Sequence, residues 1–123
     1  MQKILIMCAD LVSEDMFRYA LNGYEIELIS DFSLIHDIDK CRETIGQKEF
    51  DVLILSNLGI WLNDVMEYVR RLPDKRGYRA VVITGCMTME LADICLSKDV
   101  PLAKLPLGRE GMIALISGEW ENR

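Results

Sequence analysis

The stretch FDVLILSNLG, residues 50–59, contains an unbroken apolar run that ends at Ser56 and Asn57. A short apolar run bounded by turn-forming residues is typical of a strand that is buried on both faces. Two other segments have the same character, KILIMC at 3–8 and RAVVIT at 79–84. Because strands buried on both faces belong to parallel sheets covered by helices on either side, the sequence predicts an α/β fold.

The remaining segments alternate between strand and helix patterns. YEIELIS at 24–30 alternates apolar and acidic residues, as a half-exposed edge strand does, and VPLAKL at 100–105 is expected to be a last short strand. Ser13 is expected to cap the first helix, which ends before Asn22 and Gly23. Further helices are expected over 34–45, 61–72, 88–97 and 109–117.

Five strands alternating with five helices predict one doubly wound domain over residues 1–123. The expected architecture is a flavodoxin-like (βα)5 three-layer sandwich with parallel strands in the order 2-1-3-4-5. In such sheets the ligand site lies at the carboxyl ends of strands 1 and 3.

Composition excludes several classes of function. A net charge of −6 argues against nucleic acid as a direct partner, and the five basic residues within 70–79 are interpreted as a solvated helix end. No apolar stretch is long enough for a membrane span, and the first ten residues do not have the pattern of a signal peptide, so we expect a cytoplasmic protein. Four widely spaced cysteines and one histidine, His36, give no zinc-site spacing. No metal, cofactor or disulfide is expected, and His36 is interpreted as a solvated helix residue.

The residues just past four of the strands carry the functional information. These segments are Cys8-Ala9-Asp10, Ser56-Asn57, Thr84-Gly85 and Lys104-Leu105-Pro106. In this layout the whole chain resembles the receiver domain of bacterial response regulators. Receivers hold Mg²⁺ with acids after strand 1, are phosphorylated on an Asp at the end of strand 3, and carry a Thr or Ser after strand 4 and a Lys-Pro after strand 5.

The resemblance implies a position in the phosphorylation site for each of these residues. Ser56 takes the place of the phosphorylated Asp, Thr84 that of the hydroxyl residue, and Lys104 that of the Lys. Cys8 and Ala9 replace the acid pair, so that only Asp10 remains where many receivers carry a third acid.

Two further positions depart from the pattern. Leu102 replaces the aromatic residue that rotates on activation, and Gly59-Ile60 replaces the usual Met-Pro.

These replacements remove the chemistry of phosphorylation. A thiol, a methyl and a hydroxyl are poor ligands for Mg²⁺, and a serine without a neighbouring base is a weak nucleophile. We therefore expect a pseudo-receiver that is not an enzyme. Thr84 and Lys104 have two interpretations: local structural contacts, with Lys104 reaching Asp10 or Asn57, or a retained anion site.

The leading functional hypothesis is a protein–protein interaction module in bacterial signal transduction that works without phosphorylation, within a larger protein or alone, with a partner protein or as a homodimer. Its expected partner surface is in the last helix–strand–helix region, at Met87, Met89, Leu102, Leu107 and Met112, although each of these can instead be a core residue. The alternative is a small-ligand sensor that uses the pocket at the carboxyl ends of strands 1 and 3. A nucleotide cofactor is not expected because no glycine-rich loop follows strand 1. A disulfide between Cys8 and Cys86 is discounted because a strand separates them.

Overall fold

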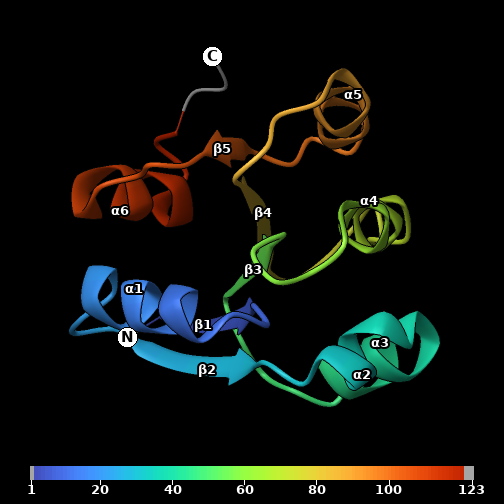
Figure 1. The fold of residues 1–123 in the computed structure, drawn as a ribbon, viewed down its shortest axis with the longest axis horizontal. Coiled ribbons are helices and arrows are strands. Elements are labelled where there is room, and N and C mark those ends of the chain that lie inside the picture. The colour runs from blue at the N-terminus through green and yellow to red at the C-terminus, as the bar shows by residue number, and fades with distance from the viewer. Residues whose placement is uncertain (1, 121–123) are drawn as a thin grey trace.

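The computed structural model describes residues 2–120, which form a five-stranded parallel sheet of order β2-β1-β3-β4-β5 (Figure 1). The strands are β1 (Lys3–Met7), β2 (Glu25–Ile29), β3 (Val52–Ser56), β4 (Arg79–Thr84) and β5 (Leu102–Lys104). All four pairings are parallel. The predicted flavodoxin-like fold and strand order are confirmed.

The sheet lies between two layers of helices (Figure 1). The helices of the described residues are α1 (Leu11–Ala20), α2 (Phe32–His36), α3 (Ile38–Gly46), α4 (Leu62–Arg70), α5 (Met89–Ser97) and α6 (Arg109–Ser117). Helices α1 and α6 cover one face of the sheet, and α2 to α5 cover the other.

Alternation along the central strands builds two cores. In β1, Ile4 and Ile6 pack with the α1 and α6 side, whereas Leu5 and Met7 pack with the side of α2 to α5. All four side chains are almost fully buried. Burial on both faces explains why the sequence of this strand shows no polar interruption.

The helix expected over 34–45 is two helices, because Asp37 interrupts it. Asp37 ends α2 and also caps α3, where its carboxylate accepts a hydrogen bond from the backbone N–H of Lys40 at 3.3 Å. A short polar side chain that bonds to nearby backbone amides competes with the continuous helical pattern. The prediction of five helices is therefore wrong by one.

The expected cap of the first helix is also wrong. Helix α1 begins at Leu11, and its cap is Asp10, whose carboxylate accepts hydrogen bonds from the Val12 N–H at 3.3 Å and the Ser13 hydroxyl at 2.8 Å. Ser13 lies inside the helix and is buried. The structure thus places the one remaining acid of the segment after β1 in a structural role.

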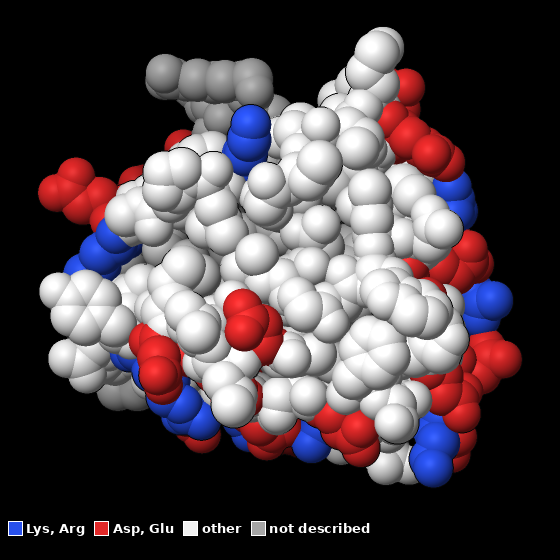
Figure 2. Space-filling model, in the orientation of Figure 1, with Lys and Arg blue, Asp and Glu red and all other residues white. Residues whose placement is uncertain are grey.

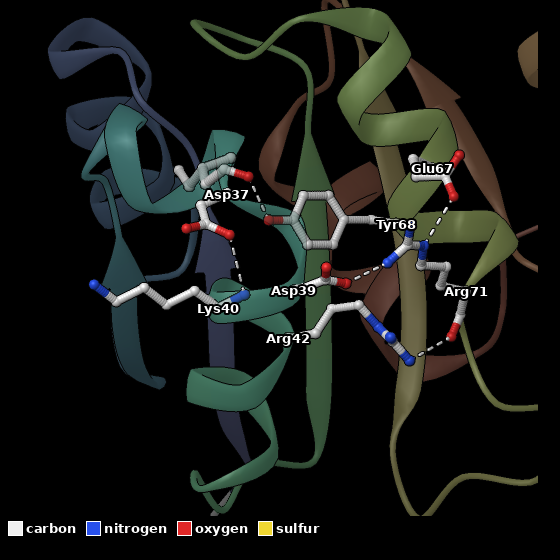
Figure 3. A network of polar contacts seen from close by, with 8 residues as sticks. Asp37, Asp39, Lys40, Arg42, Glu67, Tyr68 and Arg71 are labelled. Carbon is white, nitrogen blue, oxygen red and sulfur yellow. Dashed lines mark hydrogen bonds and ion pairs between the residues drawn. The ribbon is translucent and has the colours of Figure 1, made fainter.

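Polar contacts join the helices that cover the second face (Figure 3). The hydroxyl of Tyr68 on α4 donates a hydrogen bond to the carbonyl of Ile35 on α2. Burial, followed by the neighbouring Cys41, raises the pKa of Tyr68 well above its usual value, so that the phenol stays a donor. Arg71 contacts Glu67 at 2.8 Å and Asp39 of α3 at 2.6 Å. None of the helices within residues 2–120 has the length and apolar character needed to cross a bilayer.

Tyr68→Phe is expected to lower the free energy of unfolding by about 1–2 kcal/mol, because the buried carbonyl of Ile35 loses its hydrogen-bond donor. The matched control is Tyr19→Phe, since Tyr19 is 82% exposed. Urea unfolding of both variants checks this. Equal stabilities for the two variants would show that the Tyr68 hydrogen bond contributes nothing.

Candidate functional site

Three of the predicted site residues lie fully buried at the carboxyl ends of neighbouring strands. Cys8 follows β1, Ser56 ends β3 and Thr84 ends β4, and each has 0% exposure. Because β3 lies between β1 and β4, these side chains approach the same edge of the sheet. The structure therefore places them around the switch point that the strand order predicts.

The thiol of Cys8 is held by backbone carbonyls. Its sulfur lies 3.7 Å from the carbonyl oxygens of Asp10 and Leu58. Burial is the main cause of a raised pKa for the Cys8 thiol, so the neutral form is favoured. A neutral buried thiol is an inert small hydrophobe rather than a nucleophile or metal ligand.

The loop after β3 lies directly on the loop after β1. The Ala9 N–H donates to the Leu58 carbonyl at 3.3 Å. Gly59 has a positive φ of 75°, and a Cβ atom at this position would lie 2.7 Å from the carbonyl carbon of Ala9. The two backbone segments are therefore in direct contact at the carboxyl ends of β1 and β3.

Among residues 2–120, no basic side chain is hydrogen-bonded to the Ser56 hydroxyl, so none of them is placed to activate it as a nucleophile. Its hydroxyl oxygen accepts a hydrogen bond from the Leu58 N–H at 3.3 Å, which makes it part of the same loop. His36 is paired with Asp64 by a 2.8 Å contact. Among residues 2–120, no three His, Cys, Asp or Glu side chains gather into a group that could hold a metal ion. The arrangement supports a structural role for Ser56.

Asn57 and Thr84 organise the neighbouring loop. The Asn57 side-chain oxygen accepts a hydrogen bond from the Gly85 N–H at 3.0 Å, which ties the loops after β3 and β4 together. The Thr84 hydroxyl donates to the Cys86 carbonyl at 2.9 Å and accepts from the Cys86 N–H at 3.0 Å. Both hydrogen bonds of the Thr84 hydroxyl are local, as the structural interpretation of this residue expects.

Lys104 is exposed, and its ammonium group makes no hydrogen bond or ion pair with any residue of the part that the structure describes. The carboxylate of Asp10 and the amide oxygen of Asn57 accept from other groups. The expected contact from Lys104 to Asp10 or Asn57 is therefore not formed. A long exposed side chain loses conformational entropy when it is fixed in one contact, and an exposed polar contact offsets little of that loss.

The predicted partner surface divides into exposed and buried residues. Met89 is 83% exposed and Met87 is 38% exposed, while Leu107 is partly buried. Leu102 and Met112 are buried in the two cores, at 7% and 0% exposure, so for these two the core interpretation is correct. Leu102 cannot act as an exposed contact residue, and neither can Met112.

The sequence reasoning missed an aromatic cluster on the helix side of the site. Trp61, just before α4, makes edge contacts with Phe32 and His36 of α2, at centroid distances of 5.4 and 4.5 Å. His36 is half exposed and bonded to Asp64, so it is a packed residue rather than a freely solvated one. The signal in the sequence was an aromatic residue at the start of each of two helices. All four cysteines are free, and Cys86 is exposed while Cys8 is buried.

No family model matches the sequence, and no curated protein matches it. Solved structures do match the fold. A response regulator from Burkholderia pseudomallei, solved with a phosphorylated aspartic acid and a calcium ion, has a TM-score of 0.73 at 17% identity; the match covers 94% of this chain and 66% of that one.

Two other similar structures are matched over nearly their whole length. A chemotaxis protein of Vibrio cholerae has a TM-score of 0.73 at 17% identity, with 98% of this chain and 99% of that chain covered. An orphan response regulator of H. pylori has a TM-score of 0.72 at 14% identity, with 98% and 97% covered. The fold is thus the one found in CheY-like receiver domains.

Gly59→Ala is expected to destabilise the protein by about 2–4 kcal/mol, because it combines a left-handed backbone conformation with an overlap on the Ala9 backbone. Gly46→Ala is the matched control, since nothing lies within 4 Å of a Cβ atom there and α3 gains a better helix former. Thermal unfolding of both variants tests the contact. If Gly59→Ala is as stable as Gly46→Ala, the two loops do not close on each other in solution.

Proposed function

We propose that the protein is a pseudo-receiver, a receiver-type module of bacterial signal transduction that acts through protein contacts and without phosphorylation. The observation that carries this proposal is the state of Ser56. It occupies the end of β3, it is fully buried, and its oxygen is committed to the Leu58 N–H. Phosphoryl transfer needs an accessible nucleophile in line with the donor and cations on the transferring oxygens.

The rest of the switch point supports the same proposal. Cys8 and Ala9 supply no carboxylate, and Asp10 is used as a helix cap. A cation at this position would be held by one shared carboxylate beside a neutral thiol, which is a weak site for Mg²⁺. The hydrogen bond between Ala9 and Leu58 also holds the two loops together, which leaves little room for an ion between them.

Exposed apolar side chains at the same end of the molecule support a role in protein contacts. Leu11 and Val12 at the start of α1 are 79% and 77% exposed, and Met89 at the start of α5 is 83% exposed. Figure 2 shows a broad face on which uncharged side chains predominate and most charged residues lie around the margin. In the same orientation, Figure 1 has the loops after β3 and β4 toward the viewer. Such a surface suits a partner protein or a second copy of this chain.

The signalling context comes from the similar structures. The names of these proteins describe response regulators and a chemotaxis protein. We extend that setting to this chain as part of the proposal, with a cytoplasmic location. The alternative, a small-ligand sensor at the carboxyl ends of β1 and β3, is not favoured by the two cavities described in the next section, because they are lined mainly by residues from the other end of the sheet.

Incubation with acetyl phosphate and Mg²⁺ is expected to leave the intact mass of the protein unchanged. Ser56 is buried, and it stands where phosphorylation would need a carboxylate nucleophile. The melting temperature is likewise expected to stay constant as Mg²⁺ rises to millimolar concentration. Native mass spectrometry and thermal unfolding provide the measurements. A stoichiometric phosphate adduct would contradict the proposal.

The variant Cys8→Asp, Ala9→Asp, Ser56→Asp tests the alignment with receivers. Three crowded carboxylates repel one another, so the metal-free variant is expected to lose about 2–4 kcal/mol of stability. Added Mg²⁺ should restore part of the loss, since an ion that binds only the folded state stabilises it. A folded variant whose melting temperature does not respond to Mg²⁺ would show that the three positions do not converge on one ion.

Met89→Glu is expected to remove partner binding while the protein stays folded, because Met89 is exposed at the first position of α5, where an acid suits the helix dipole. Ser56→Ala should bind normally, and Tyr19→Glu is the control at an exposed aromatic residue elsewhere. Pull-down from the source cell with all four proteins compares them. Equal recovery of the same partner on the wild type and on Met89→Glu would place the interface outside this surface.

A further inference from the structure

A cavity of about 690 Å³ opens at the amino ends of the strands, opposite the site described above. It lies between α3 and α4 and is lined by residues that precede β3 and β4, including Phe50, Asp51 and Tyr78. Its volume is within the range of roughly 300–1,000 Å³ that is typical of small-molecule sites. None of the residues predicted for the phosphorylation pocket lines it.

The cavity combines an apolar floor with an aromatic wall. The floor is formed by the buried side chains Ile45, Leu53 and Leu72. Phe50 and Tyr78 form a tilted ring pair with centroids 4.7 Å apart, and both are partly exposed. A flat apolar group bound here can bury one side against the apolar floor. Its other side can stack on the aromatic rings or pack edge-on against them.

Basic residues gather around this cavity in a protein that is acidic overall. The cavity adjoins a second one of about 660 Å³ that shares Asp51, Gly77 and Tyr78 with it. Together their linings hold eight of the fourteen Lys and Arg residues of the chain but only four of its twenty Asp and Glu residues. The linings themselves thus carry more basic than acidic side chains although the net charge is −6, and an excess of positive charge in a concave surface attracts anions.

Three arginines in the linings, Arg42, Arg76 and Arg79, form no ion pair with an acid among residues 2–120, and Arg79 donates to the carbonyl of Leu115 at 3.0 Å. Arg42 donates to the carbonyl of Arg71 at 3.2 Å, and Arg76 donates to the carbonyl of Pro73 at 2.9 Å. The Nε atom of Arg76 is buried and has no hydrogen-bond partner. A buried guanidinium N–H without an acceptor is a rare feature that calls for a ligand or bound water.

Arg42 and Arg76 lie close to the aromatic wall. Burial raises the pKa of the Tyr78 phenol, and the positive charges of Arg76 and Arg42 act in the opposite direction. Arg42 lines the larger cavity together with Tyr78, and Arg76 lines the adjoining cavity together with the same residue. By contrast, other lining cations are paired: Lys48 with Glu27 at 2.6 Å and Lys98 with Asp74 at 3.3 Å.

The entrance is held in place by contacts between α3 and the end of α4 (Figure 3). Arg42 extends from α3 to the Arg71 carbonyl, and Arg71 reaches back to Asp39 at 2.6 Å. Of the two acids in the lining of the larger cavity, Asp51 is engaged by the backbone N–H of Lys3 at 2.8 Å, and Glu49 is exposed. The site is thus largely preformed, which reduces the entropy cost of binding.

We propose that this cavity is a binding site for a small planar organic anion, such as an aromatic carboxylate. The anionic group is bound by Arg42 of this cavity and by Arg76, which reaches it from the lining of the adjoining cavity. The ring packs against Phe50 and Tyr78, and the apolar body covers the floor between α3 and α4. Planar guanidinium groups suit a carboxylate because they donate two hydrogen bonds in a fixed fork.

Nuclear magnetic resonance titration of the intact chain with 1-naphthoate tests the site. We expect saturable shifts of the amides of residues 45–53 and 68–78 and little change near Cys8 or Ser56. The neutral analogue 1-naphthalenemethanol, which keeps the ring system, should bind at least tenfold more weakly, and inorganic phosphate should bind more weakly than 1-naphthoate because it has no ring.

The double variant Arg42→Gln, Arg76→Gln is expected to weaken 1-naphthoate binding at least tenfold and to leave the affinity for the alcohol unchanged. Arg18→Gln, Lys40→Gln is the charge-matched control, since both side chains are exposed and lie outside the cavity linings. Equal affinities of the wild type for the acid and the alcohol would overturn the proposal without any variant. So would equal weakening by the control pair, or shifts that map to the carboxyl ends of the strands.

Discussion

Burial of β1, β3 and β4 on both faces is the constraint from which the rest of the molecule follows. Ile54 and Leu55 are neighbours in β3, yet they point into different cores, and each is at most 1% exposed. A strand of this kind is stable only with helices on both sides of the sheet, and parallel neighbours then require a helical crossover between each pair. The carboxyl ends of these strands consequently gather Cys8, Ser56 and Thr84 at one edge.

What the protein does with that edge depends on small residues. At the carboxyl ends of β1 and β3, the small residues Ala9 and Gly59 allow the two backbones to meet, and the Ser56 hydroxyl accepts a hydrogen bond from the loop after β3. The contact between these loops is therefore stabilised by backbone hydrogen bonds and burial rather than by ion coordination. The strand order does not depend on how these loops meet, because a fold does not determine the chemistry of the site that it carries.

The sequence predicts those features that repeat with a period. Apolar runs located β1, β3 and β4, the alternating pattern of 24–30 identified the edge strand β2, and the short segment 100–105 predicted β5. Single local hydrogen bonds were missed, as at Asp37, where one carboxylate divides a helix, and at Asp10, which caps α1 in place of Ser13. Residue type alone could not show that Met112 is buried and Met89 exposed, because exposure depends on which side of its helix each residue occupies.

Contacts between distant segments were beyond the reach of any sequence pattern, and they distinguish the two ends of the sheet. Phe50 and Tyr78 are far apart in the chain and meet only because β3 and β4 are adjacent in register. The carboxyl end is closed, whereas the amino end is open and basic, and α4 connects them: it begins beside Trp61 and carries Tyr68 into the cavity lining. A ligand bound between α3 and α4 would change the exposed face near Trp61 only under one condition. Helix α4 would need two positions, and the ligand would have to bind one of them more tightly than the other.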